Sequence, residues 1–213
     1  GRRFHYEVYT AADAGYSGRV TVPVLWDKER NTIVNNESAE IIRMLNSAFN
    51  DLTGNSADYY PDALHGEIDA WNERIYPAIN NGVYRAGFAT TQEAYEEAYR
   101  ELFAELDRLD KHLGTQRYLV GDQLTEADIR LFTTLIRFDA VYHGHFKCNR
   151  QRLEDFTHLP GYVRDIYQLP GVAETVDFGH IKTHYYASHR TINPAGVVPL
   201  GPDIDYATAH GRG

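Results

Sequence analysis

Two short motifs near the start of the chain carry residue types that could bind a small zwitterionic ligand. Glu37 and Ser38 open the segment Ala39–Leu45, whose apolar residues fall at helical spacing. Backbone N–H groups at a helix start favour an anion, to which Ser38 could add a hydroxyl, while Glu37 could pair with an ammonium group. A γ-glutamyl head group carries both charges. The simpler interpretation is that Ser38 caps the helix and Glu37 complements its dipole, which spacing alone favours because such starts are common.

Val22-Pro23 interrupts the predicted strand Val20–Asp27. Proline cannot donate to a sheet ladder, so its position inside a strand is unusual. A cis bond would leave the backbone N–H and C=O of Val22 free for a peptide-like ligand. The alternative is an ordinary trans proline at a sheet edge, since only ~5–6% of X–Pro bonds are cis.

Tyrosine is abundant, with 16 copies, and four of these residues are candidate substrate contacts. Tyr76 and Tyr84 lie in a predicted helix, and Tyr185 and Tyr186 lie in the segment His184–His189. A phenol hydroxyl can hydrogen-bond a phenolic substrate and stabilise a developing oxyanion. Packing in the core is the alternative for each of them.

The histidines and the single cysteine carry weaker signals. His143 with His145, and His180 with His184, have the spacing of metal ligands, but no acidic partner or third ligand is fixed by the sequence. We therefore predict no metal site. Cys148 is the one cysteine, which excludes an internal disulfide, fits a reducing compartment and is interpreted as a buried structural thiol.

The chain changes from strand-like to helical periodicity across a polar segment, which predicts two domains. We expect an α+β, mostly α fold. Its predicted parts are a β-β-α unit in residues 1–50, a linker at 51–62, an all-helical domain at 63–190 and an extended tail at 191–213. Phe4–Tyr9 is predicted as a further strand. These elements are too few for a closed first domain, so we expect an upstream segment to complete it.

The helical domain shows several start and stop signals. A helix over 63–84 is expected to bend near Pro77. Thr90 and Glu93 form a predicted capping box for a helix that ends at Gly114. Further signals are a second box at Thr125 and Asp128 before a buried helix over 129–138, and short helices starting near Pro160 and Pro170.

Composition limits the possible function classes. Hydrophobic residues make up 43% and charged residues 24%, which is typical of a globular protein. The net charge of −9 argues against an extended nucleic-acid interface. No apolar run is long enough for a membrane span, and no signal peptide is visible, so we expect a cytoplasmic protein that binds neither membrane nor nucleic acid.

Seven segments give the chain a strong, nearly end-to-end resemblance to the Xi-class glutathione transferases, the glutathionyl-hydroquinone reductases. The segments are Val22–Asp27, Ile33–Leu45, Asn80–Phe88, Leu119–Phe132, His145–Asn149, His184–His189 and Ile192–Pro194. The Glu-Ser helix start and the capped helix are general features of glutathione transferases, whereas the tail motif is specific to this class. The resemblance implies part of a thioredoxin-like domain followed by an all-helical glutathione-transferase domain.

The resemblance also implies residue roles. Glutathione would be the co-substrate, held by Val22, Pro23, Glu37 and Ser38. Tyr84 and Tyr185 match the family's tyrosines over the substrate best, with Tyr76 and Tyr186 as further substrate contacts. The expected partners are glutathione, quinone or hydroquinone conjugates and a second copy of the chain in a homodimer.

One family motif, the nucleophile's Cys-Pro-Trp-Ala, does not occur in this sequence. Cys148 belongs to a different motif and should not inherit that role. We therefore expect the nucleophile upstream of this chain, and expect the chain alone to be inactive. Two alternatives remain: a conventional transferase that conjugates glutathione, and a non-catalytic module that serves protein assembly.

Overall fold

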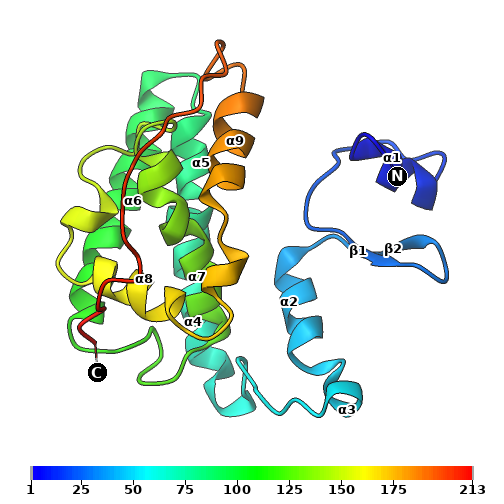
Figure 1. Cartoon of the computed structure of the whole chain (residues 1–213), viewed down its shortest axis with the longest axis horizontal. Helices are drawn as coiled ribbons and strands as arrows, with labels where there is room; N and C mark the ends of the chain where they lie inside the picture. The colour runs from blue at the N-terminus through cyan, green and yellow to red at the C-terminus, as the bar shows by residue number, and fades with distance from the viewer. Residues whose placement is uncertain (1, 213) are drawn as a thin grey trace. The chain divides into compact units, whose positions relative to one another are not determined.

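The computed structural model describes residues 2–212, which divide after Tyr60 into two compact units, each described here by itself (Figure 1). The first unit contains α1 (Tyr6–Ala12), β1 (Leu25–Asp27), β2 (Thr32–Asn35), α2 (Ser38–Ser47) and α3 (Asn50–Thr53). The α-helices of the second unit are α4 (His65–Ile75), α5 (Gly82–Gly87), α6 (Gln92–Leu113), α7 (Glu126–Arg137), α8 (Leu159–Tyr167) and α9 (Phe178–Ser188). Single 3₁₀ turns lie at Asp62–Leu64, Leu153–Asp155 and Ala173–Thr175, and π-helical turns lie at Tyr76–Asn80 and Phe138–Tyr142.

A short antiparallel hairpin forms the sheet of the first unit. Trp26 pairs with Ile33, and the Asp27 carboxylate accepts the backbone N–H groups of Glu29 and Arg30 in the turn. The predicted strand Val20–Asp27 is wrong over its first half, because the strand begins only at Leu25. Pro23 has no N–H to donate to a ladder, which accounts for the late start.

The prediction of a strand over Phe4–Tyr9 is also wrong, because this segment leads into helix α1. One Glu7 carboxylate oxygen accepts the backbone N–H groups of Arg3 (2.7 Å) and Phe4 (3.0 Å). These bonds hold the residues that precede α1 against its first turn. Helical spacing then turns Tyr9 into the interior of the unit, where only 2% of it is exposed.

The predicted helix over 63–84 is interrupted at Pro77, as expected, but continues to Gly87. The interruption is a π-helical turn, which accommodates a residue that cannot donate a backbone N–H. The amide nitrogen of Asn80 in this turn donates to Thr134 Oγ1 (2.7 Å) and to the carbonyl of Arg130 (3.0 Å), and so joins the turn to α7.

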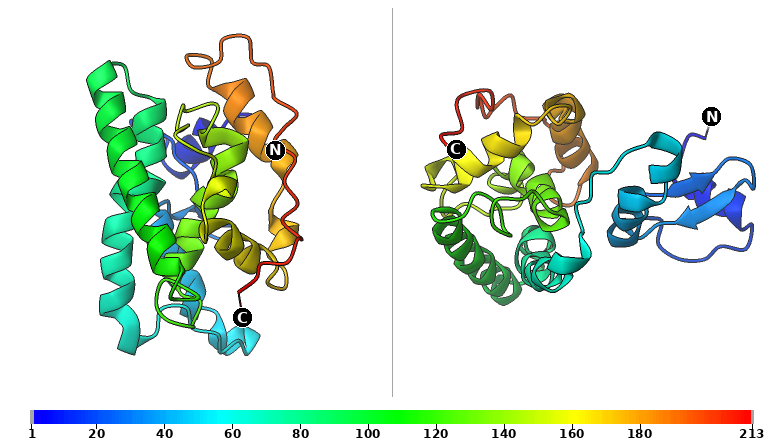
Figure 2. Two further views of the ribbon diagram at one scale, coloured as in Figure 1. Left: turned by 90° about the vertical axis from the view of Figure 1, so that its left-hand side faces the viewer. Right: turned by 90° about the horizontal axis from the view of Figure 1, so that it is seen from below.

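Helix α6 is confirmed with its stop at Gly114, but its cap lies one residue later than predicted. Thr91, not Thr90, accepts the backbone N–H of Ala94 (3.2 Å). A Cβ at position 114 would lie 2.7 Å from the His158 ring, so a larger residue there would force this ring to shift. Figure 2 shows α6 as the longest helix, running beside α4 and α5.

The predicted capping box of α7 is confirmed, including the reciprocal bond from Asp128. Its carboxylate accepts the N–H and the hydroxyl of Thr125, both at 2.9 Å. It also accepts the N–H of Leu119 (2.9 Å) and the hydroxyl of Tyr162 (2.8 Å). Asp128 is fully buried, so this carboxylate organises the centre of the helical unit.

The last segments differ in part from expectation. Pro160 lies in the first turn of α8, as predicted, whereas Pro170 precedes only the 3₁₀ turn at Ala173–Thr175. Residues 191–212 contain no helix or strand, and in Figure 1 this segment runs back from α9 towards α8. Near its end it is bound to α8, because Gln168 donates to the carbonyls of Tyr206 (2.9 Å) and Thr208 (2.7 Å).

Candidate functional site

The predicted glutathione residues lie on two segments of the first unit. The Val22-Pro23 bond is cis, and 74% of Val22 is exposed. Within residues 2–212, no hydrogen bond occupies the backbone N–H or C=O of Val22. This backbone edge is therefore open to a peptide-like ligand, although the roles of Val22 and Pro23 stay predictions.

Helix α2 begins at the second predicted segment. Glu37 is its N-cap and Ser38 its first residue, and the N–H of Glu37 donates to Asn35 Oδ1 (2.6 Å). Ser38 makes no capping bond, and among the described residues neither its hydroxyl nor the Glu37 carboxylate has a hydrogen-bond partner. The simpler interpretation of Ser38 as a cap is therefore wrong. Both exposed side chains remain available for a charged head group.

In the second unit, three tyrosine hydroxyls form a chain. Tyr185 Oη, on α9, lies 2.5 Å from Tyr84 Oη on α5 and 2.9 Å from Tyr142 Oη in the second π-helical turn. Sequence reasoning singled out Tyr84 and Tyr185 and missed Tyr142. The available signal was its spacing, since Tyr142 follows Phe138 by four residues and continues the buried face of α7 beyond the predicted end.

Aromatic rings enclose this chain of hydroxyls. Phe146 lies against the rings of Tyr84 (5.5 Å between centroids), Tyr142 (5.5 Å) and Tyr185 (5.9 Å). A Cβ at position 87 would lie 2.2 Å from the Phe146 ring, so only glycine allows this ring to approach α5. The His189 ring also stacks on Phe146 (5.8 Å) and meets the edge of Tyr185 (5.5 Å). The resulting wall is aromatic and carries the tyrosine hydroxyls, as expected of a site for a phenolic ring.

Burial raises the pKa of two of these hydroxyls. Desolvation raises the pKa of Tyr185, and it raises the pKa of Tyr142 well above its usual value of 10. The nearby Tyr84 phenol acts in the same direction on both. Near neutral pH the hydroxyls of Tyr142 and Tyr185 are therefore protonated, and they can donate hydrogen bonds to an oxygen that gains negative charge.

The remaining candidates lie apart from this chain or beside it. Tyr76 lies in the first π-helical turn with 55% of it exposed, and within the described part of the chain it makes no ring contact with Tyr84, Tyr142 or Tyr185. Tyr186 instead packs on His145, with 4.6 Å between ring centroids. The substrate roles assigned to Tyr76 and Tyr186 stay predictions.

The histidines do not assemble a metal centre. His145 Nε2 lies 3.2 Å from His189 Nδ1, and desolvation lowers the pKa of His145 to about 4, with His189 as the next contribution. His145 is thus neutral near pH 7. In residues 2–212 there is no group of three or more His, Cys, Asp or Glu side chains placed to hold a metal ion.

Cys148 is confirmed as a buried thiol. It has no exposed surface, and burial raises its pKa to about 12. A thiol needs to be deprotonated to act as a nucleophile, so Cys148 is unsuited to that role.

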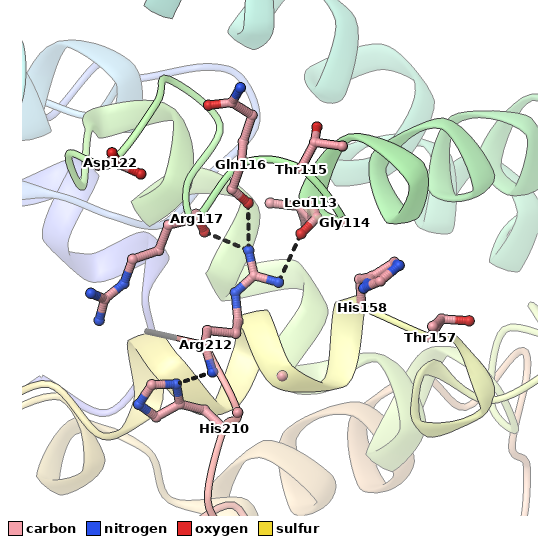
Figure 3. A pocket seen from close by; sticks show the side chains of 12 residues that line it. Leu113, Gly114, Thr115, Gln116, Arg117, Asp122, Thr157, His158, His210 and Arg212 are labelled. Carbon is pink, nitrogen blue, oxygen red and sulfur yellow. Dashed lines mark hydrogen bonds between the residues drawn. The ribbon is translucent and has the colours of Figure 1, made fainter.

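A separate hollow of about 400 Å³ lies where the C-terminal tail meets the end of α6 (Figure 3). The Arg212 guanidinium donates there to the carbonyls of Leu113 (2.9 Å), Gln116 (2.6 Å) and Arg117 (2.7 Å). None of the predicted site residues lines this hollow. The Arg212 contacts fasten the tail to the helix end, which is a structural role.

Comparison with known proteins supports the class that this fold and these residues define. The glutathione S-transferase N-terminal domain model matches residues 4–48, and the C-terminal domain model matches residues 92–165. The structure superposes on the glutathione-bound structure of YqjG, a glutathione transferase homolog from Escherichia coli K-12, with a TM-score of 0.97. The two sequences are 59% identical, and the match covers 99% of this chain and 68% of the YqjG chain. A glutathione S-transferase Xi from Phanerochaete chrysosporium gives a TM-score of 0.92 and 51% identity, covering 95% and 70% of the two chains.

Two curated relatives carry a more specific name. Glutathionyl-hydroquinone reductase YqjG of Escherichia coli is 60% identical over 98% of this chain, and glutathionyl-hydroquinone reductase PcpF of Sphingobium chlorophenolicum is 57% identical over 95% of it. This chain spans 64% of the length of each. The chain therefore belongs to the glutathione transferase family, in its Xi class, with a thioredoxin-like part followed by the helical domain.

Proposed function

We propose that the protein is a glutathionyl-hydroquinone reductase, with glutathione as its co-substrate. The observation that carries the proposal is the Tyr84–Tyr185–Tyr142 chain of hydrogen-bonded hydroxyls in an aromatic wall. Such a wall suits an aromatic ring that carries phenol oxygens. The 57–60% identity to two proteins named for this activity supports the same assignment.

The proposed reaction is a thiol exchange at sulfur. A cysteine thiolate attacks the glutathione sulfur of the conjugate, forming an S–S bond and breaking the bond between sulfur and the aromatic carbon. The released electron pair stays on the ring carbon, which takes up a proton, and the hydroquinone departs. A second glutathione, as its thiolate, then attacks the glutathionyl sulfur of the mixed disulfide, giving glutathione disulfide and the enzyme thiolate.

The residues of this chain would supply binding and electrostatics. The Val22 backbone, Glu37 and Ser38 would hold glutathione, and Tyr84 and Tyr185 would donate to the phenol oxygens as charge moves onto the ring. Cys148 is buried with its pKa raised to about 12, so it is not the proposed thiolate. We assign that role to the family's Cys-Pro-Trp-Ala motif, which residues 1–213 do not contain.

We place the protein in the cytoplasm as a homodimer that disposes of quinones. The single cysteine fits a reducing compartment. Each helix within residues 2–212 is too short or too polar to cross a lipid bilayer.

The test is turnover by the full-length protein with a glutathionyl-hydroquinone and excess glutathione. We expect equal amounts of free hydroquinone and glutathione disulfide. Conjugation of glutathione to an electrophile without any reduction of the conjugate would indicate an ordinary transferase. Failure to bind glutathione in calorimetry would favour the non-catalytic module instead. Either result would overturn the proposal.

A further inference from the structure

Tyr9, on α1, makes contacts that the proposed reaction does not account for. Its hydroxyl donates to the carbonyl of Thr21 (2.8 Å) and accepts the backbone N–H of the same residue (3.1 Å). The Thr21 carbonyl also lies 2.7 Å from His5 Nε2. Two side chains from the start of the chain therefore fix the backbone of the residue that immediately precedes Val22-Pro23.

The same Tyr9 hydroxyl reaches the other predicted glutathione segment. It accepts a hydrogen bond from Asn36 Nδ2 (3.1 Å), and this nitrogen also lies 3.4 Å from Thr21 Oγ1. Asn36 immediately precedes Glu37, the N-cap of α2. The hydroxyl also lies 3.2 Å from Thr21 Oγ1, so contacts with Thr21 and Asn36 engage its one proton and both lone pairs.

Only 2% of Tyr9 is exposed, and its ring packs against those of His5 (5.5 Å) and Tyr16 (4.8 Å). The hydroxyl is thus held in place by its own packing. Deleting it would leave the Thr21 N–H and the Asn36 amide without this partner, while the ring could stay where it is.

We propose that Tyr9 is a positioning residue for glutathione, which fixes the backbone edge at Val22 relative to the helix start at Glu37 and Ser38. The inference rests on the proposed function, because it takes these two segments as the glutathione site. One peptide ligand that contacts both segments gains from having them ordered beforehand, since ordering a loop on binding lowers affinity. Tyr9 does not touch the ligand in this arrangement and acts through Thr21 and Asn36.

The experiment uses the full-length protein and compares Tyr9→Phe with Tyr6→Phe by calorimetry with glutathione. Tyr6 lies on the same helix, is 53% exposed, and its hydroxyl has no hydrogen-bond partner among the described residues, so it is a matched control. We expect the dissociation constant of Tyr9→Phe to rise about tenfold and that of Tyr6→Phe to stay within about twofold of wild type.

Two further readouts separate positioning from a general loss of structure. In turnover, Tyr9→Phe should raise the KM for glutathione while kcat at saturating glutathione stays within about twofold. Asn36→Ala should also weaken glutathione binding, and the double variant should lose less than the sum of the two effects, because both remove the same link.

Each outcome tests either the proposed function or the positioning role of Tyr9. If wild type itself fails to bind glutathione, the proposed function fails first. If wild type binds but Tyr9→Phe binds equally well, or if Asn36→Ala has no effect, the positioning role is wrong. If Tyr9→Phe does not fold, Asn36→Ala alone supplies the test, since the proposal requires it to weaken binding while the melting temperature is kept.

Discussion

Replacing Tyr185 with phenylalanine removes the hydroxyl that joins the other two members of the chain. Tyr185 Oη lies 2.5 Å from Tyr84 Oη and 2.9 Å from Tyr142 Oη. Tyr142 is 2% exposed, so its hydroxyl would lose its partner in a place that water reaches poorly. The phenylalanine ring would keep the contact with Phe146, which confines the change to one oxygen atom.

Two magnitudes follow from this geometry. Leaving a buried hydroxyl unpaired costs about 1–3 kcal/mol of folding free energy. For a chain of this size that corresponds to a fall in melting temperature of roughly 2–12 °C. If Tyr185 also donates to the phenol oxygen in the transition state, the loss of about 1–3 kcal/mol of stabilisation lowers kcat/KM by about 5- to 150-fold.

The assay is turnover of a glutathionyl-hydroquinone by the full-length protein, together with calorimetry for glutathione and a thermal melt. We expect kcat/KM to fall by the stated factor while the dissociation constant of glutathione is unchanged. Tyr99→Phe is the control, because the Tyr99 hydroxyl has no hydrogen-bond partner in the described part of the chain. A Tyr185→Phe protein that keeps wild-type kcat/KM would refute the role of the hydroxyl in catalysis.

Three further predictions concern the helical unit. Asp128→Ala removes the acceptor of four hydrogen bonds and should lower the free energy of unfolding, measured in urea, by about 3–5 kcal/mol. As a control, Asp122→Ala at an exposed position should change it by less than about 0.5 kcal/mol. Equal effects of the two substitutions would contradict the role assigned to Asp128. His145, whose pKa falls to about 4, takes up a proton more readily in the unfolded chain, so stability should decrease as pH falls from about 6.5 towards 4. This decrease, read from urea midpoints at about pH 7 and about pH 5, should be smaller in His145→Gln, and an unchanged pH dependence would count against the explanation. Cys148, whose pKa is raised to about 12, should resist iodoacetamide in the native protein and react with it in denaturant. Peptide mapping measures the alkylation. Alkylation of Cys148 in the native protein would show that the thiol is accessible and would contradict its burial.

Local signals in the sequence predicted much of the helical unit, because their physics is contained within a few residues. Thr125 and Asp128 formed the expected box, since a cap needs only its own first turn. The predicted cap of α6 lies one residue early because Thr90 and Thr91 carry the same hydroxyl, and only the helix geometry shows which one accepts the N–H of Ala94. The pattern of Phe4–Tyr9 alternates as in a strand, and the bonds from Arg3 and Phe4 to the Glu7 carboxylate beside α1 are seen only in the structure.

In the candidate site, too, the sequence predicts local features and does not predict contacts between distant residues. Glu37-Ser38 at the start of α2 and the proline at 23 are local features, so the sequence and its family resemblance were sufficient to predict them. Tyr142 was missed because its importance depends on Tyr185, 43 residues away, and no local pattern joins the two. The hydrogen bonds of Tyr9 to Thr21 and Asn36 also join residues far apart in the sequence, so no local pattern predicts them.

By itself the sequence determined the family, the positions of the long helices in the second unit, the absence of a cysteine other than Cys148 and the residue types that could hold glutathione and a phenolic ring. Those properties follow from composition, spacing and motifs. Tertiary structure alone decided that three tyrosines share hydrogen bonds and that one Tyr9 hydroxyl links two segments. The physical reason is that pKa values and hydrogen-bond partners depend on which distant groups exclude water from a side chain, and folding decides that.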